Sequence, residues 1–208
     1  MTISTSPKSP LSLEPATLKD IPALTELWYN AFRNSPIIAI WPDTPGVHQW
    51  WNEANTHDML HKPGEKYLKI VDTQTRRIAA YAKWSLESAE ERGRRFPAWH
   101  SDMNAQGNEE FLENMETGRD RLVGGRKNFY LDMIATHTEY RKMGAARMLI
   151  EWGCAVADRE GAAVYIDASQ QGRPVYEKFG FVDFSDERSA AAGLASMVDV
   201  SYLAYFAT

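Results

Sequence analysis

The sequence predicts a mixed α/β fold, with one central mixed sheet flanked by helices. In the second half, strand-like and helix-like periods alternate from residue 129 to residue 184, which implies a partly parallel sheet with helices packed on it. In the first half, β-type runs at residues 67–71 and 77–84 flank a polar segment and predict an antiparallel hairpin. The composition, 44% hydrophobic and 25% charged, is that of a globular chain.

Length, charge and cysteine content further narrow the classes of protein that the sequence could encode. The 208 residues fit one large domain, which we expect to span residues 11–208 after a flexible arm at residues 1–10. A net charge of −5 argues against a nucleic-acid partner, because a phosphate backbone is met by a basic face. No run approaches the ~18 apolar residues of a membrane span. The single cysteine, Cys154, excludes an intrachain disulfide and favours a reducing compartment, the cytoplasm.

The first half begins with a predicted edge strand at residues 11–15 and a helix at residues 21–32. Thr17 and Asp20 form a capping-box pattern at the start of this helix. Residues 35–63 are rich in proline and tryptophan, with one further helix expected between residues 46 and 61. The aromatic density suits either the core or a pocket wall, and the tryptophans concerned are Trp41, Trp50, Trp51 and Trp84.

Residues 88–127 are predicted to be an insertion with some helix, because the apolar content falls there and charges of both signs alternate. Two interpretations stay open for it, a solvated face and a lid or substrate wall.

The second half is more regular. We expect strands at residues 129–135 and 164–168, and a helix at residues 144–159 that ends at Gly161. A short helix at about residues 172–178, ending at Gly180, and strands at residues 181–184 and 196–206 complete the predicted order.

The segment with the clearest chemical meaning follows the strand at residues 129–135 and opens the next helix. It reads Arg141, Lys142, Met143, Gly144, Ala145, Ala146. Unpaired N–H groups and the dipole at a helix start favour an anion, and a glycine allows close approach. The segment therefore predicts a phosphate site.

Two longer stretches carry a family resemblance. Residues 134–149, Ile-Ala-Thr-His-Thr-Glu-Tyr-Arg-Lys-Met-Gly-Ala-Ala-Arg-Met-Leu, resemble the acetyl-CoA motif of the GNAT acetyltransferase superfamily, with Arg141, Gly144 and Ala146 at its diagnostic positions. Residues 169–181, from Ser-Gln-Gln-Gly-Arg-Pro to Gly-Phe, resemble the family's second motif. The departures are Thr136, Thr138, Ser169 and Gly172. The arrangement is more faintly similar to fungal members that act on small molecules.

The resemblance implies a GNAT-like sheet in which two parallel strands splay apart to hold acetyl-CoA. One strand contributes Met133, Ile134 and Ala135, and the other passes through Asp167. The pyrophosphate would meet residues 142–146, and Ser169 would contact the pantetheine. Residues 35–63 and 88–127 match no motif and would determine the substrate.

The resemblance also implies direct transfer of the acetyl group to the primary amine of a small molecule. It does not name that molecule. A backbone N–H near Ile134 would steady the oxyanion, and Tyr176 matches the general acid. Asp132 and Asp167 are the two candidate bases, and the residues do not decide between them. A monomer or homodimer with no metal is expected.

Several alternatives stay open at this stage. The same fold could serve as a non-catalytic acyl-CoA sensor or scaffold, and histone acetylation is a further alternative among enzymes. His57 and His61 stand at i and i+4, a spacing found in zinc hydrolases, but a surface or pocket-lining pair is favoured. Cys154 is interpreted as a packed thiol rather than a nucleophile.

Overall fold

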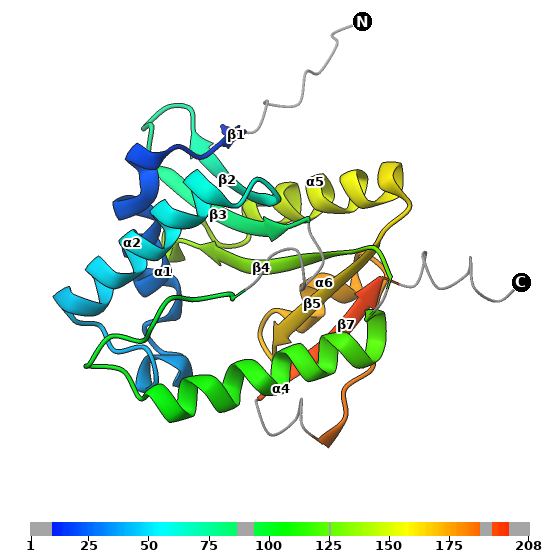
Figure 1. Cartoon of the computed structure of the whole chain (residues 1–208). Coiled ribbons are helices and arrows are strands. Elements are labelled where there is room, and N and C mark those ends of the chain that lie inside the picture. The colour runs from blue at the N-terminus through cyan, green and yellow to red at the C-terminus, as the bar shows by residue number, and fades with distance from the viewer. Residues whose placement is uncertain (1–9, 87–93, 125, 188–192, 200–208) are drawn as a thin grey trace, which may run out of the picture.

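The computed structural model describes residues 10–86, 94–124, 126–187 and 193–199. Helices and strands alternate along this part of the chain in an order that Figure 1 follows by colour. The elements are β1 (Leu11–Pro15), α1 (Ile21–Phe32), α2 (Pro45–His61), β2 (Glu65–Asp72), β3 (Ile78–Ser85), α4 (Ala105–Val123), β4 (Asn128–Thr136), α5 (Ala145–Glu160), β5 (Ala163–Ser169), α6 (Arg173–Glu177), β6 (Phe181–Asp183) and β7 (Leu194–Asp199).

The strands form a single mixed sheet of seven within the described residues, in the order β1-β2-β3-β4-β5-β7-β6. Neighbours are antiparallel except β4 and β5, which run parallel. The predicted fold class and the hairpin of β2 and β3 are therefore confirmed. The last predicted strand begins at Leu194, and its residues 200–206 lie outside the described part, as do residues 1–9 of the predicted arm and residues 88–93 of the predicted insertion.

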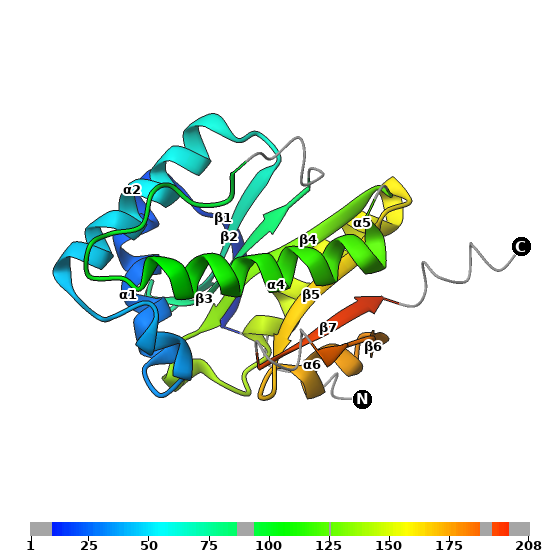
Figure 2. The same cartoon turned by 60° about the horizontal axis from the view of Figure 1, so that its bottom comes forward.

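Helices cover both faces of the sheet (Figures 1 and 2). The face covered by α5 and α6, here the α5 face, buries an apolar core with Leu131, Ile166, Leu149 and Tyr176 among its members. The opposite face, here the α4 face, is covered by α1, α2 and α4. Figure 2 shows α4 crossing in front of β4 and β5, so the predicted insertion contributes a helix to this layer.

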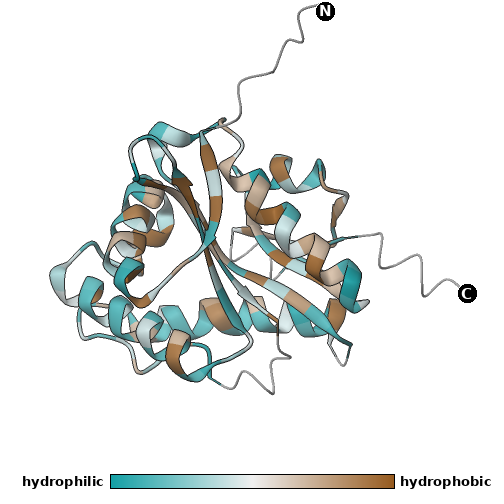
Figure 3. Ribbon diagram, turned by 90° about the horizontal axis from the view of Figure 1, so that it is seen from above, coloured by the Kyte–Doolittle hydropathy of each residue, from teal (hydrophilic) through white to brown (hydrophobic). Residues whose placement is uncertain are grey.

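Hydrophobic periodicity explains the two layers. In Figure 3 brown strands run between helices whose outer sides are largely teal. Along α5, Leu149, Ile150 and Ala157 are buried, as one apolar stripe of a surface helix requires. Gly161 ends that helix at φ +59°, in the left-handed region that glycine adopts without strain.

In the described residues, none of the helices has the combined length and apolarity needed to cross a membrane.

Candidate active site

The loop before α5 has the geometry expected of an anion site. Lys142 and Gly144 both adopt positive φ, +64° and +87°, and turn the chain into the helix start. A Cβ on Gly144 would meet no protein atom within 4 Å, so the left-handed backbone, rather than protein packing, explains the glycine. Ala145 and Ala146 are the first residues of α5, where backbone N–H groups have no acceptor within the helix.

The other loop residues differ in what they contact. Arg141 donates from Nη2 to the carbonyl oxygen of Ala31 at 2.9 Å, which ties the loop to the end of α1. Met143 is 46% exposed and Lys142 is exposed as well. The helix start thus presents backbone donors beside one ammonium group, an arrangement that suits a pyrophosphate.

The two parallel strands pair over a short stretch only. Their register runs from Asn128 opposite Ala163 to Leu131 opposite Ile166, while both strands continue for several more residues. Beyond this point Met133, Ile134 and Ala135 on β4 and Asp167 on β5 are no longer part of the β4–β5 pairing. The splay that the family resemblance implies is present, and a slender ligand with amide groups would fit between such edges.

A bulge on β4 lies at the start of the splay. Lys83 pairs with Met133 and Trp84 pairs with Leu131, so Asp132 is the extra residue of the strand. The bulge allows Asp132 and Met133, although adjacent in sequence, to both contact residues of the α4 face: Asp132 meets Lys83, and the sulfur of Met133 meets Trp28 Nε1 at 3.1 Å.

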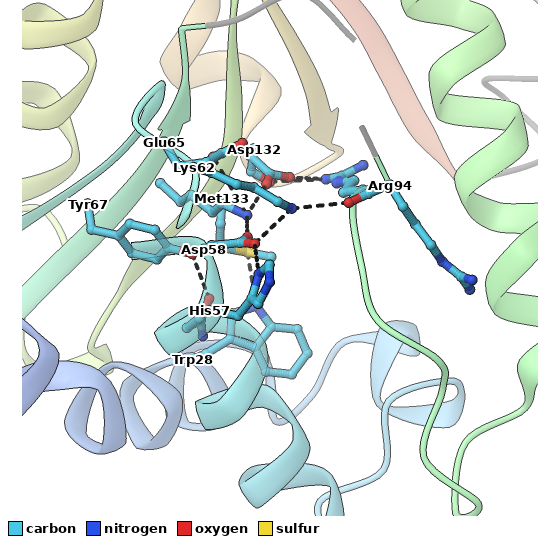
Figure 4. Close-up of polar contacts among 12 residues, drawn as sticks. Trp28, His57, Asp58, Lys62, Glu65, Tyr67, Arg94, Asp132 and Met133 are labelled. Carbon is cyan, nitrogen blue, oxygen red and sulfur yellow. Dashed lines mark hydrogen bonds and ion pairs between the residues drawn. The ribbon is translucent and has the colours of Figure 1, made fainter. Parts of the chain in front are cut away.

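Asp132 belongs to a buried cluster of charges that sequence analysis did not predict. Lys83 Nζ lies 2.6 Å from a carboxylate oxygen of Asp58, 2.9 Å from Asp132 and 3.6 Å from Glu65. Lys62 reaches the second oxygen of Asp58 at 2.7 Å (Figure 4). Burial alone would lower the pKa of Lys83, but the surrounding carboxylates outweigh burial and raise it well above its usual value. Lys83 is therefore a fixed ammonium ion.

A strap formed by residues 94–104 closes over this cluster from the direction of α4. Its Arg95 is buried and its guanidinium pairs with Asp132 on the side away from Lys83. The strap is held at other points, since Trp50 Nε1 donates to the carbonyl oxygen of Ala98 at 2.8 Å and Lys62 donates to that of Arg94 at 3.1 Å. Asp132 thus lies between two buried cations.

A small cavity adjoins the cluster. Its volume of about 10 Å³ is close to the room that one water requires. Aromatic rings and polar groups line it together, namely Trp51, Asn55, Tyr67, Tyr81, Lys83, Phe96, Asp132 and Met133. Trp51, Trp41 and Trp50 belong to the buried core of the α4 face, whereas Trp84 packs on the α5 face.

Asp167, the second candidate base, has a different environment. It accepts hydrogen bonds from Tyr130 at 2.9 Å and from Tyr165 at 2.8 Å. Burial raises the pKa of this carboxyl to about 6, while the two tyrosine donors act in the opposite direction. A carboxylate that titrates near neutral pH suits proton transfer.

Tyr176 and Ser169 lie where the second motif predicted functional groups. Tyr176 is 6% exposed on α6 and its ring packs near that of Phe181, with centroids 6.0 Å apart. Burial raises the pKa of its phenol, which therefore stays protonated and able to donate. Ser169 Oγ accepts from the N–H of Gly172 at 3.1 Å and so caps the turn before α6.

Comparison with known families identifies the part of the chain that holds these groups. The family model described as acetyltransferase (GNAT) domain matches residues 96–197, which include the loop before α5, both splayed strands and α6. Residues 96–197 therefore form a GNAT acetyltransferase domain. No curated protein sequence matches it.

Solved structures share this GNAT fold at low sequence identity. A histone acetyltransferase HPA2 and related acetyltransferase from Corynebacterium glutamicum is 18% identical, with a TM-score of 0.58 over 91% of this chain and 95% of that one. The mosquito arylalkylamine N-acetyltransferase like 5b is 13% identical, with a TM-score of 0.62 over 90% and 98%. The PaiA N-acetyltransferase of Thermoplasma acidophilum, solved with coenzyme A, is 10% identical, with a TM-score of 0.57 over 91% and 98%.

The structure brings together some of the residues that the sequence singled out and leaves others apart. The loop, the splay, Asp132 and Asp167 lie around the β4–β5 junction, and Tyr176 is on the neighbouring helix α6. His57 and His61 have ring centroids 4.8 Å apart on α2, and no set of three or more metal-binding side chains occurs in the described residues. Cys154 is half-buried, and burial raises its pKa to about 12, as expected of a packed thiol.

Proposed function

We propose that this GNAT acetyltransferase transfers the acetyl group of acetyl-CoA to the primary amine of a small molecule. The observation that carries the proposal is the splay of β4 from β5, flanked by the glycine loop on one side and buried carboxylates on the other. Acetyl-CoA supplies the activated thioester. We assign its binding to Met133, Ile134, Ala135, Ser169 and the loop of residues 141–146.

The chain's own residues would divide the chemistry as follows. The N–H groups and Lys142 at the start of α5 bind pyrophosphate, which fixes the thioester between the strands. Tyr176 keeps its proton at neutral pH and donates it to the leaving thiolate. Asp132 and Asp167, both beside the splay, are the two candidate carboxylates for taking the proton of the incoming ammonium group.

The walls of the α4 face support a small cationic acceptor. Trp51, Tyr67 and Phe96 place aromatic surface beside Asp132, and their cavity of about 10 Å³ would have to widen to take an amine with an apolar body. The shared fold of the mosquito arylalkylamine N-acetyltransferase supports the same class of acceptor. The histone-type relative shares the fold as well, so peptide amines belong in the test panel.

We further propose one domain over residues 11–208 with residues 88–127 as an insertion, a cytoplasmic location, and a monomer or homodimer. The half-buried cysteine supports a reducing compartment.

The experiment is a thiol-release assay with acetyl-CoA and a panel of arylalkylamines, polyamines and lysine peptides. We expect thiol release that depends on the amine and is fastest for arylalkylamines, with the acetylated product identified by mass spectrometry. Tight binding of acetyl-CoA with no release for any amine would contradict the proposal and favour an acyl-CoA sensor.

A further inference from the structure

Two tyrosines converge on Asp167 from neighbouring strands. Tyr130 lies on β4 within the last paired stretch, and Tyr165 lies two residues before Asp167 on β5. Each hydroxyl donates to a different oxygen of the carboxylate, at 2.9 Å and 2.8 Å. The carboxylate is therefore oriented from both sides at the point where the strands begin to separate.

The hydrogen bonds around Asp167 continue toward β7. The Tyr165 hydroxyl lies 3.2 Å from Ser196 Oγ as well as 2.8 Å from Asp167. A hydroxyl has one hydrogen, so it donates to one of these partners at a time and accepts from the other when the hydrogen turns. Asp167, Tyr165 and Ser196 thus form a chain along which a proton could pass.

Asp132 lacks this freedom. Lys83 and Arg95 hold its carboxylate as the shared counter-ion of two buried cations. Adding a proton to Asp132 would leave both cations facing a neutral acid in a buried site, which is costly. The hydrogen bonds that Asp167 accepts come from the neutral hydroxyls of Tyr130 and Tyr165, so within the described residues its protonation breaks no ion pair.

Charged groups of the strap and of α4 lie near Asp167 and its tyrosines. Arg95 of the strap opposes its protonation and Glu116 of α4 favours it. Arg119 of α4 lies with its guanidinium carbon 4.8 Å from the Tyr130 ring centroid, and Arg95 lies 5.0 Å from the same centroid. These fixed charges act equally in variants that alter only a tyrosine hydroxyl.

We propose that Asp167 accepts the proton of the acceptor ammonium, that Tyr130 and Tyr165 are its positioning residues, and that Asp132 remains a fixed counter-ion. This inference rests on the proposed acetyl transfer. An N–H bond of the ammonium breaks and an O–H bond forms on Asp167, which leaves a neutral amine with a free electron pair. That pair forms the amide C–N bond as the C–S bond breaks, and the electrons leave with sulfur.

The ammonium nitrogen loses two protons in this reaction, and both can be followed. The second proton lost by nitrogen equals the one that the thiolate gains from Tyr176, whose phenol is restored through solvent. The proton on Asp167 is released to water before the next turnover. One proton is released per turnover of an ammonium substrate.

The test compares Tyr165→Phe and Tyr130→Phe with the wild-type protein. Removing a donor to the carboxylate favours its protonated form. We expect the acidic limb of kcat/KM for the amine to move to higher pH by about one pH unit in either variant. In the unliganded protein, carbon-13 NMR of the Asp167 carboxyl should show its titration moving in the same direction.

Matched variants separate this role from a structural one. Tyr29→Phe removes a hydroxyl that bonds the carbonyl oxygen of Pro42 at 3.2 Å on the far part of the α4 face, and it should move neither titration. Asp167→Asn should lower kcat/KM by about 10²-fold to 10⁴-fold and abolish the limb, with coenzyme A binding retained.

Each outcome bears on the inference. If the carboxyl titration moves while the kinetic limb stays in place, another group accepts the proton and the inference is wrong. The same holds if Asp167→Asn keeps full turnover. Absence of thiol release from the wild-type protein would overturn the proposed function together with this inference, whereas turnover with an unmoved limb overturns the inference alone.

Discussion

The α5 face and the α4 face of the same sheet bury different kinds of side chain. The α5 face is an apolar core to which Leu131, Ile166 and Leu149 belong. The α4 face combines aromatic rings with buried ions such as Lys83 and Asp132. Apolar packing therefore holds α5 on one face, whereas ion pairs with Asp132 hold Lys83 and Arg95 on the other.

The largest effect should come from breaking the charge cluster. Lys83→Met keeps the length of the side chain but leaves three buried carboxylates without their shared cation. We expect the free energy of unfolding to fall by about 3–5 kcal/mol, measured by denaturant titration. Lys66→Met, the same change at an exposed site on β2, should alter it by less than about 0.5 kcal/mol. Equal losses in the two variants would show that the buried Lys83 contributes no more to stability than an exposed lysine.

The next effect concerns a single hydroxyl on the α5 face. Tyr176→Phe should lower kcat by about 10²-fold, because a positioned acid is lost while a small buried change leaves the fold intact. Coenzyme A affinity should stay near the wild-type value in calorimetry. A variant that keeps its full rate would show that Tyr176 only packs against Phe181.

A smaller effect distinguishes the two ends of α5. Gly144 and Gly161 both have positive φ and both have open space where a Cβ would lie, so substitution strains them alike. Gly144→Glu should weaken coenzyme A binding at least tenfold, since the carboxylate fills and repels the anion site. Gly161→Glu should bind with unchanged affinity. Calorimetric titration of the two folded variants measures this, and equal affinities would place the phosphate site elsewhere.

The smallest effect is expected at the cysteine of the α5 face. Cys154→Ala should leave turnover unchanged and alter the free energy of unfolding by less than about 1 kcal/mol, because the thiol is half-buried. Its pKa of about 12 makes the native thiolate about a thousandfold scarcer than at an exposed cysteine. Alkylation at pH 8 should therefore be slow until the protein unfolds. Rapid alkylation with loss of activity would show that Cys154 is a reactive thiol.

Most of the α5 face could be predicted from the sequence because its signals are local. The spacing of Leu149, Ile150 and Ala157 defines one stripe of a helix, and Gly144 and Gly161 mark its two ends. The hairpin was predictable for the same reason, since a polar turn separates two short β-type runs. The splay was expected only from the family resemblance, because strand separation leaves no local pattern.

The charge cluster could not be predicted because its partners are distant in sequence. Lys83 bonds Asp58, 25 residues earlier, and Arg95 bonds Asp132, 37 residues later. The one local signal was a lysine within the apolar run of residues 78–84, where a buried strand seldom places a charge. The bulge that lets both Asp132 and Met133 contact residues of the α4 face depends on strand register, which residue type alone does not fix.

Amide hydrogen exchange tests the division between the two faces most directly. On adding acetyl-CoA to the wild-type protein, we predict slower exchange at residues 141–147 and along β4 at residues 133–136. Adding an amine acceptor that supports turnover should then slow exchange in the strap of residues 94–104 and leave α5 unchanged. Protection of the strap by acetyl-CoA alone, with residues 141–147 unaffected, would contradict the account.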